Sequence, residues 1–92
     1  MPISLSLGEL KKMLIDAGDR TRLNELNLTK VGRDYAELTL MSKKLSHNKS
    51  MDEEYLHLVH SQLSILKQEL SPHRLSVLDD IIKQIFPYYF TT

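Results

Sequence analysis

Residues 51–70 read MDEEYLHLVHSQLSILKQEL, and their periodicity indicates the class of the fold. Leucine and valine recur at alternating steps of three and four, which places them on one face of an α-helix. This face consists of Leu56, Val59, Leu63, Leu66 and Leu70, and Tyr55, Leu58 and Ile65 widen it to roughly half of the helix circumference. We therefore expect this helix to be the central one, packed against more than one neighbour.

Capping patterns mark the start of this helix and of the helix that follows it. Ser50 and Glu53 have the spacing of a capping box, which predicts that the helix begins directly after Ser50. Ser71 and Pro72 predict the cap and first residue of a last helix, because proline lacks the amide proton that a first turn leaves unpaired. The apolar face expected for this last helix consists of Leu75, Leu78, Ile81, Ile82, Ile85 and Phe86.

The first half of the chain contains two further helical segments. Ser6 and Glu9 form another capping-box pattern and predict a helix that ends at Gly18, where a left-handed glycine can terminate it. Asp19 then predicts the N-cap of a second segment, which extends to about Ser46. The apolar positions of the second segment are Leu23, Leu26, Leu28, Val31, Tyr35, Leu38, Met41 and Leu45.

A weak point lies inside the segment of residues 19–46. Gly32 and the sequence Asn27-Leu28-Thr29 disfavour a continuous helix, since glycine costs roughly 1 kcal/mol relative to alanine within a helix. Whether this segment forms one helix or two stays open from the sequence. Apart from a short alternation at residues 3–7, no strand pattern competes. We expect residues 1–92 to form one all-α domain, a small bundle of four antiparallel helices, or five, with short connections.

Length and composition exclude several classes of protein. The 92 residues suffice for one core, and 41% hydrophobic with 26% charged residues is ordinary for a globular domain. No apolar run approaches the roughly 20 residues that span a bilayer, and the N-terminus lacks the pattern of a secretory signal. Without cysteine there is neither a disulfide nor a thiolate zinc site. We therefore expect an intracellular protein, of the cytoplasm or the nucleus, that does not bind membranes.

Most aromatic residues lie at the C-terminus. Phe86, Tyr88, Tyr89 and Phe90 are four of the six in the chain. Pro87 ends the last helix and leaves residues 87–92 as an aromatic tail. Two interpretations stay open. Either the tail folds back and closes the core, or it is exposed for a partner, in which case these four aromatic residues are the candidate partner-binding residues.

Charge is unevenly distributed, although the net charge is zero. Residues 1–50 carry nine Lys or Arg and six Asp or Glu, whereas residues 51–92 carry three and six. The candidate contacts to nucleic acid are Lys30, Arg33, Lys43, Lys44 and Lys49. Asp34 and Glu37 interrupt this series and the domain is neutral, so the sequence does not favour nucleic acid. The complementary charges of the two halves are also compatible with a polar homodimer.

A group of acidic residues and histidines lies near the start of residues 51–70. It consists of Glu53, Glu54, His57 and His60. Their spacing could present a carboxylate and two imidazoles on one helical face. Because Ser64 and Lys67 continue this face opposite the leucines, a solvated polar face is the better interpretation, and we expect no metal and no cofactor. Glycine-rich phosphate loops and the Gly-x-Ser-x-Gly motif are absent from the sequence, so we expect no enzymatic activity and no catalytic residue.

Two segments resemble parts of transcription-related families. Residues 14–26, LIDAGDRTRLNEL, resemble the first helical segment of the enhancer-of-yellow transcription and mRNA-export adaptors. The Cys-Gly-Trp that follows this segment in that family is absent here. Residues 54–70 resemble the last helix of the KIX coactivator domain, although another helix is expected to follow in this chain. Because of these two departures, no functional residue is transferred from either family.

Together the patterns favour a small non-enzymatic adaptor or regulator, with transcription as one setting. We expect it to bind another protein through a groove between helices or through the aromatic tail. The alternative is a dimeric regulator that associates with nucleic acid through the basic residues of segment 30–49. The sequence identifies neither the partner nor the oligomeric state.

Overall fold

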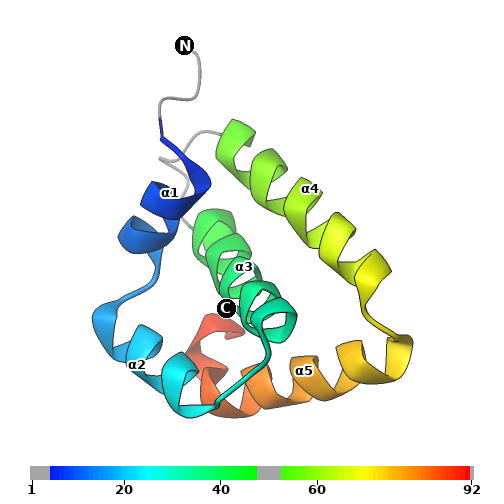
Figure 1. The fold of residues 1–92 in the computed structure, drawn as a ribbon. Coiled ribbons are helices and arrows are strands. Elements are labelled where there is room, and N and C mark those ends of the chain that lie inside the picture. The colour runs from blue at the N-terminus through cyan, green and yellow to red at the C-terminus, as the bar shows by residue number, and fades with distance from the viewer. Residues whose placement is uncertain (1–4, 48–52, 92) are drawn as a thin grey trace.

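The chain folds into a small bundle of α-helices (Figure 1). The structure is a computed structural model that describes residues 5–47 and 53–91. Its elements are α1 (Leu7–Leu14), α2 (Ala17–Glu25), α3 (Lys30–His47), α4 (Glu53–Glu69), α5 (Pro72–Ile85) and the short 3-10 helix η1 (Pro87–Tyr89). These described ranges contain no β-strand and no helix long and apolar enough to cross a bilayer. The all-α prediction is confirmed.

Helix α3 lies at the centre of the bundle, between α1 and α4 (Figure 1). Its buried residues are Gly32, Tyr35, Ala36, Glu37, Leu38, Leu40, Met41 and Leu45. Within α4, by contrast, only Val59 and Leu63 are buried, and Ile65 is 51% exposed. The expectation that residues 51–70 form the central helix is therefore wrong. An apolar stripe shows that a helix packs against something, but it does not show how many neighbours surround the helix.

The boundary between the first two helices also differs from the prediction. Helix α1 ends at Leu14, Ile15 has an extended backbone, and Asp16 occupies the N-cap position of α2. Gly18 and Asp19, predicted as a helix stop and an N-cap, both lie inside α2. Ile15 is 1% exposed, and the gain from burying its side chain is a tertiary effect that local capping patterns do not contain.

The weak point near residues 27–32 is a break between two helices. Helix α2 ends at Glu25, and Asn27 adopts a left-handed backbone with φ of 53°, which asparagine tolerates better than most residues. The Gly32 amide then donates a hydrogen bond of 3.2 Å to the Thr29 hydroxyl, which satisfies a donor at the start of α3. The segment therefore forms α2 and α3, and the described ranges contain five α-helices in total.

Two of the predicted caps are present. The Glu9 amide donates to Ser6 Oγ at 3.1 Å, and the Ser6 amide donates back to the Glu9 carboxylate at 3.1 Å. Ser71 caps α5 by accepting a hydrogen bond of 3.1 Å from the amide three residues later. The predicted cap at Ser50 lies outside the described residues, as does the predicted contact residue Lys49.

Candidate functional site

The aromatic tail folds back against the bundle. Phe86 and Tyr89 are buried, at 0% and 4% exposure, whereas Tyr88 is 48% exposed. The rings of Phe86 and Tyr89 meet edge to face, with their centres 6.0 Å apart. One side of the tail therefore belongs to the core. The accessible rings of the tail are those of Tyr88 and the partly exposed Phe90.

A buried carboxylate on α2 attaches the tail to the bundle. The hydroxyls of Tyr88 and Tyr89 both donate to Asp19, the second at 2.6 Å. Arg22 lies 3.4 Å from the same carboxylate and donates to the Tyr88 hydroxyl at 3.0 Å. Burial and the hydrogen bond to Asp19 raise the pKa of Tyr89 above its usual value, so its hydroxyl remains a donor. Asp19 therefore serves a long-range contact rather than the N-cap predicted for it.

Two lysines of α3 lie over the rings of the tail. The Lys43 ammonium is 5.0 Å from the centre of the Phe90 ring, and the Lys44 ammonium is 5.4 Å from that of Tyr89. Lys44 Nζ also lies 4.0 Å from a carboxylate oxygen of Asp16. The structure thus brings together part of the two residue sets predicted from the sequence, the basic residues and the aromatic tail. Lys43 and Lys44 line a hollow of about 250 Å³ together with Tyr88 and Tyr89.

The basic residues at the start of α3 are paired with acidic residues. Lys30 lies 3.2 Å from Asp34, and Arg33 lies 3.4 Å from Glu37, each one helical turn away. The buried Glu37 also binds Lys11 of α1 at 3.0 Å. These pairs reduce the positive potential at two of the five predicted nucleic-acid contacts.

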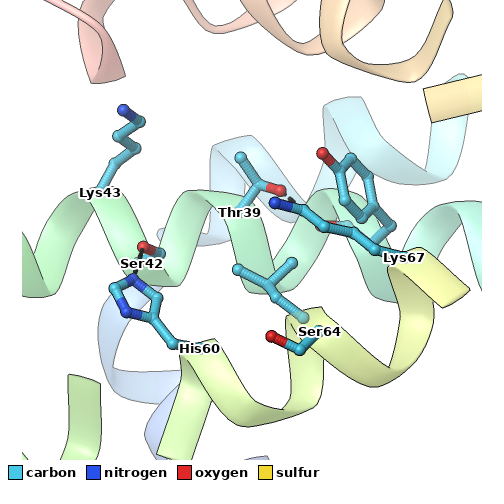
Figure 2. Close-up of a pocket in the computed structure, with 8 residues that line it drawn as sticks. Thr39, Ser42, Lys43, His60, Ser64 and Lys67 are labelled. Atoms are coloured by element: carbon cyan, nitrogen blue, oxygen red, sulfur yellow. Dashed lines mark hydrogen bonds between the residues drawn. The ribbon is translucent and has the colours of Figure 1, made fainter. Parts of the chain in front are cut away.

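A larger groove lies between α3 and α4, and we call it the α3–α4 groove. Its volume is about 420 Å³. It is lined by Tyr35, Thr39, Ser42 and Lys43 from α3 and by His60, Leu63, Ser64 and Lys67 from α4. Figure 2 shows His60 and Lys67 extending from α4 toward α3.

Hydrogen bonds hold the polar groups of the groove in place. The Tyr35 hydroxyl donates to Asp79 of α5 at 2.6 Å, and burial together with this carboxylate raises the pKa of Tyr35 to about 12. The Thr39 hydroxyl donates to the Tyr35 carbonyl oxygen at 2.8 Å. Ser42 Oγ and His60 Nε2 share a hydrogen bond of 2.8 Å, which links the two walls (Figure 2).

The two lysines of the groove have no close carboxylate partner in the described chain. Among residues 5–47 and 53–91, neither Lys43 nor Lys67 forms an ion pair. Leu63, which is 8% exposed, adds an apolar surface between the polar groups. The groove therefore combines positive charge, hydroxyl groups and one apolar contact.

The residues of the polar face predicted on α4 line two separate hollows. His60, Ser64 and Lys67 line the α3–α4 groove, whereas Glu53 and His57 line a separate hollow of about 500 Å³. Within the part of the chain that the structure describes, no group of three or more histidine or acidic side chains is arranged to hold a metal ion. The spacing of these residues on one helix therefore does not place them in one site.

The Ser42 and His60 pair has the distance of a nucleophile and its base. In the described ranges, however, no carboxylate pairs with His60 to orient the imidazole. Ser42 also lies inside α3, where backbone amides are already bonded within the helix and cannot stabilise an oxyanion. Within the described residues, the pair therefore lacks the orienting carboxylate and the oxyanion donors of an acyl-transfer site.

Thr39 and Ser42 were not among the site residues predicted from the sequence. A signal for them does exist, because residues 35, 39 and 42 repeat the steps of four and three that separate residues 60, 64 and 67. Two polar strips of equal spacing on adjacent helices can face each other along a shared groove. Which two helices are adjacent is, however, a property of the tertiary structure.

No protein-family model, curated protein or solved structure matches this chain. The similarities of residues 14–26 and 54–70 to known families therefore remain short resemblances.

Proposed function

We propose that the chain is a non-enzymatic protein-interaction module, a small adaptor or regulator that binds another protein in the α3–α4 groove. The groove itself carries the proposal, because its walls are linked by Ser42 and His60 and its lysines have no ion pair in the described ranges. Leu63 provides an apolar contact within the same groove. Protein interfaces commonly combine an apolar centre with a polar rim in this way.

The aromatic tail extends this proposed surface at one end. Lys43 lines both the α3–α4 groove and the hollow beside the tail, so the two are neighbours. Tyr88 and Phe90 would offer accessible rings there, and aromatic residues are enriched at protein interfaces. Phe86 and Tyr89 are buried, so we assign them the role of supporting this surface from the core.

Nucleic acid has less support as the partner. Lys30 and Arg33 are paired with acidic neighbours, and Lys44 lies near Asp16. Sequence-independent binding to a phosphate backbone depends on several cations that are free to contact it. The net charge of zero adds no long-range attraction.

Filling the groove tests the proposal. Ser64→Tyr adds a ring at an exposed position in the groove, and Ser61→Tyr adds the same ring to α4 in the separate hollow. Both tagged variants and the wild type are purified from a lysate of the source cells, with and without nuclease, after circular dichroism has shown that they are folded. We expect a nuclease-resistant protein to accompany the wild type and Ser61→Tyr in near-stoichiometric amount and to be lost from Ser64→Tyr.

Two results would contradict the proposal. Equal recovery of the partner with both variants would show that the groove is not the binding site. Recovery of nucleic acid, or of proteins that nuclease treatment removes, would favour the nucleic-acid alternative instead.

A further inference from the structure

The charge of the α3–α4 groove indicates the chemistry of its partner. Lys43 on α3 and Lys67 on α4 line the groove from its two walls, and the Lys43 ammonium also lies 5.0 Å from the centre of the Phe90 ring at the end of the groove beside the tail. In residues 5–47 and 53–91 no carboxylate forms an ion pair with either lysine. Two such cations in one concave site attract an anionic group of the partner.

The remaining lining groups are suited to a carboxylate. The exposed Ser64 carries a hydroxyl that can donate a hydrogen bond, and Lys67 carries three N–H donors. An ionised carboxylate only accepts hydrogen bonds, and bonds to charged groups are the stronger ones. Leu63 lies among these donors and offers an apolar contact. The groove therefore matches a segment that presents an acidic and an apolar side chain together.

The shape and surroundings of the groove favour polypeptide over nucleic acid. A volume of about 420 Å³ accommodates a few side chains, whereas a duplex is held by cations spread along its backbone. The other lysines and the arginine of α3 lie near acidic residues, since Lys30 and Arg33 bind acidic neighbours and Lys44 lies 4.0 Å from Asp16.

We propose that the α3–α4 groove binds an acidic segment of its partner, with an Asp or Glu side chain between Lys43 and Lys67 and an adjacent apolar side chain on Leu63. This inference rests on the proposed function, because it names the partner chemistry of the same groove. It goes further by assigning the two lysines as the residues that select the partner.

Charge reversal tests the assignment. The probe is a fluorescein-labelled peptide of four Glu-Leu-Asp repeats, compared by fluorescence anisotropy with a peptide of four Gln-Leu-Asn repeats. Lys43→Glu with Lys67→Glu is compared with Lys12→Glu with Lys83→Glu, because those exposed lysines lie outside the groove and the net charge changes equally. Lys67→Glu alone is included, since Lys43 also contacts Phe90.

We expect the acidic peptide to bind the wild type more tightly than the amide peptide. Its affinity should fall roughly tenfold or more in the groove double variant, severalfold in Lys67→Glu, and less than about threefold in the control. Binding should also weaken as salt is raised. Equal affinity for the two peptides, or equal losses in the two double variants, would overturn the inference. So would tighter binding of a labelled twelve-nucleotide thymidine strand.

The lysate purification separates this inference from the proposed function. If a partner is lost from Ser64→Tyr but retained by Lys43→Glu with Lys67→Glu, the groove binds protein and the acidic assignment is wrong. If Ser64→Tyr retains the partner, the proposed function itself fails. Loss of the partner from both variants, with retention by the Lys12→Glu and Lys83→Glu control, supports both proposals.

Discussion

Helices α3 and α4 have similar lengths, 18 and 17 residues, but they occupy very different environments. Helix α4 has the more regular leucine stripe in the sequence, yet only Val59 and Leu63 within it are buried. Helix α3 has an interrupted stripe and buries eight residues, including the carboxylate of Glu37. The contrast shows that regular periodicity marks one packed face, whereas the number of packed faces depends on which helices surround the segment.

Small residues give a second reason for the central position of α3. Gly32 and Ala36 are both buried in it. A Cβ atom at Gly32 would lie 3.2 Å from Thr29 Oγ1 and 3.5 Å from Leu78 Cδ2, so α5 approaches α3 closely there. The less enclosed α4 leaves the polar groups of the α3–α4 groove accessible. The proposed binding surface is therefore a consequence of the unequal burial of the two helices.

The largest expected effect comes from a cavity in α3. Leu40 is 0% exposed, so Leu40→Ala should lower the free energy of unfolding by about 2–5 kcal/mol. Leu66→Ala removes the same atoms from a partly buried position in α4 and should cost roughly 1–2 kcal/mol, because less apolar area is lost. Urea denaturation measures both values. Equal losses would mean that α4 is as enclosed as α3 and would remove the basis of the comparison.

A buried charge in α3 should give the next largest effect. Glu37 is 4% exposed and binds Lys11 and Arg33, so Glu37→Gln loses both charged contacts and should lower the free energy of unfolding by about 1–2 kcal/mol. Asp34→Asn is the matched control, because its partner Lys30 has a side chain that is 91% exposed. The control should cost less than about 0.5 kcal/mol. Urea denaturation would refute this ranking if Asp34→Asn lowered the free energy of unfolding more than Glu37→Gln.

Local patterns in the sequence predicted some of the local features of this fold. The caps at Ser6 and Ser71 depend on neighbours within one turn, and both are present. The hydrogen bond from Tyr89 to Asp19 joins residues 70 positions apart, and Asp19 was assigned a capping role that is locally reasonable but wrong. The groove escaped prediction for the same reason, because Ser42 meets His60 only once α3 and α4 have packed.

Tyr35 provides a smaller, pH-dependent effect on the α3 side. Its pKa is raised from 10.0 to about 12 in the folded protein by burial and by the carboxylate of Asp79. The unfolded chain releases this proton first, so the contribution of Tyr35 to stability is complete below pH 10.0 and is lost as the pH rises toward about 12. Tyr35→Phe should cost about 1 kcal/mol at pH 7 by removing the hydrogen bond. The difference in the free energy of unfolding between Tyr35→Phe and the wild type should become smaller between these pH values. A difference that stays constant would contradict the raised pKa of Tyr35.

The smallest expected effect comes from the outer side of α4. Ile65 is 51% exposed, so Ile65→Ala should change the free energy of unfolding by less than about 0.5 kcal/mol. The melting temperature of the wild type should also be independent of protein concentration, which differential scanning fluorimetry over a hundredfold range can check.

A homodimer through this side of α4 would reverse both expectations. Association stabilises the folded state by mass action, so the melting temperature of the wild type would rise with protein concentration. Ile65→Ala would then remove an interface contact, lower the melting temperature and weaken its dependence on concentration. Under that outcome α4 would be packed on two sides, as its leucine stripe first suggested, with a second copy of the chain as the missing neighbour.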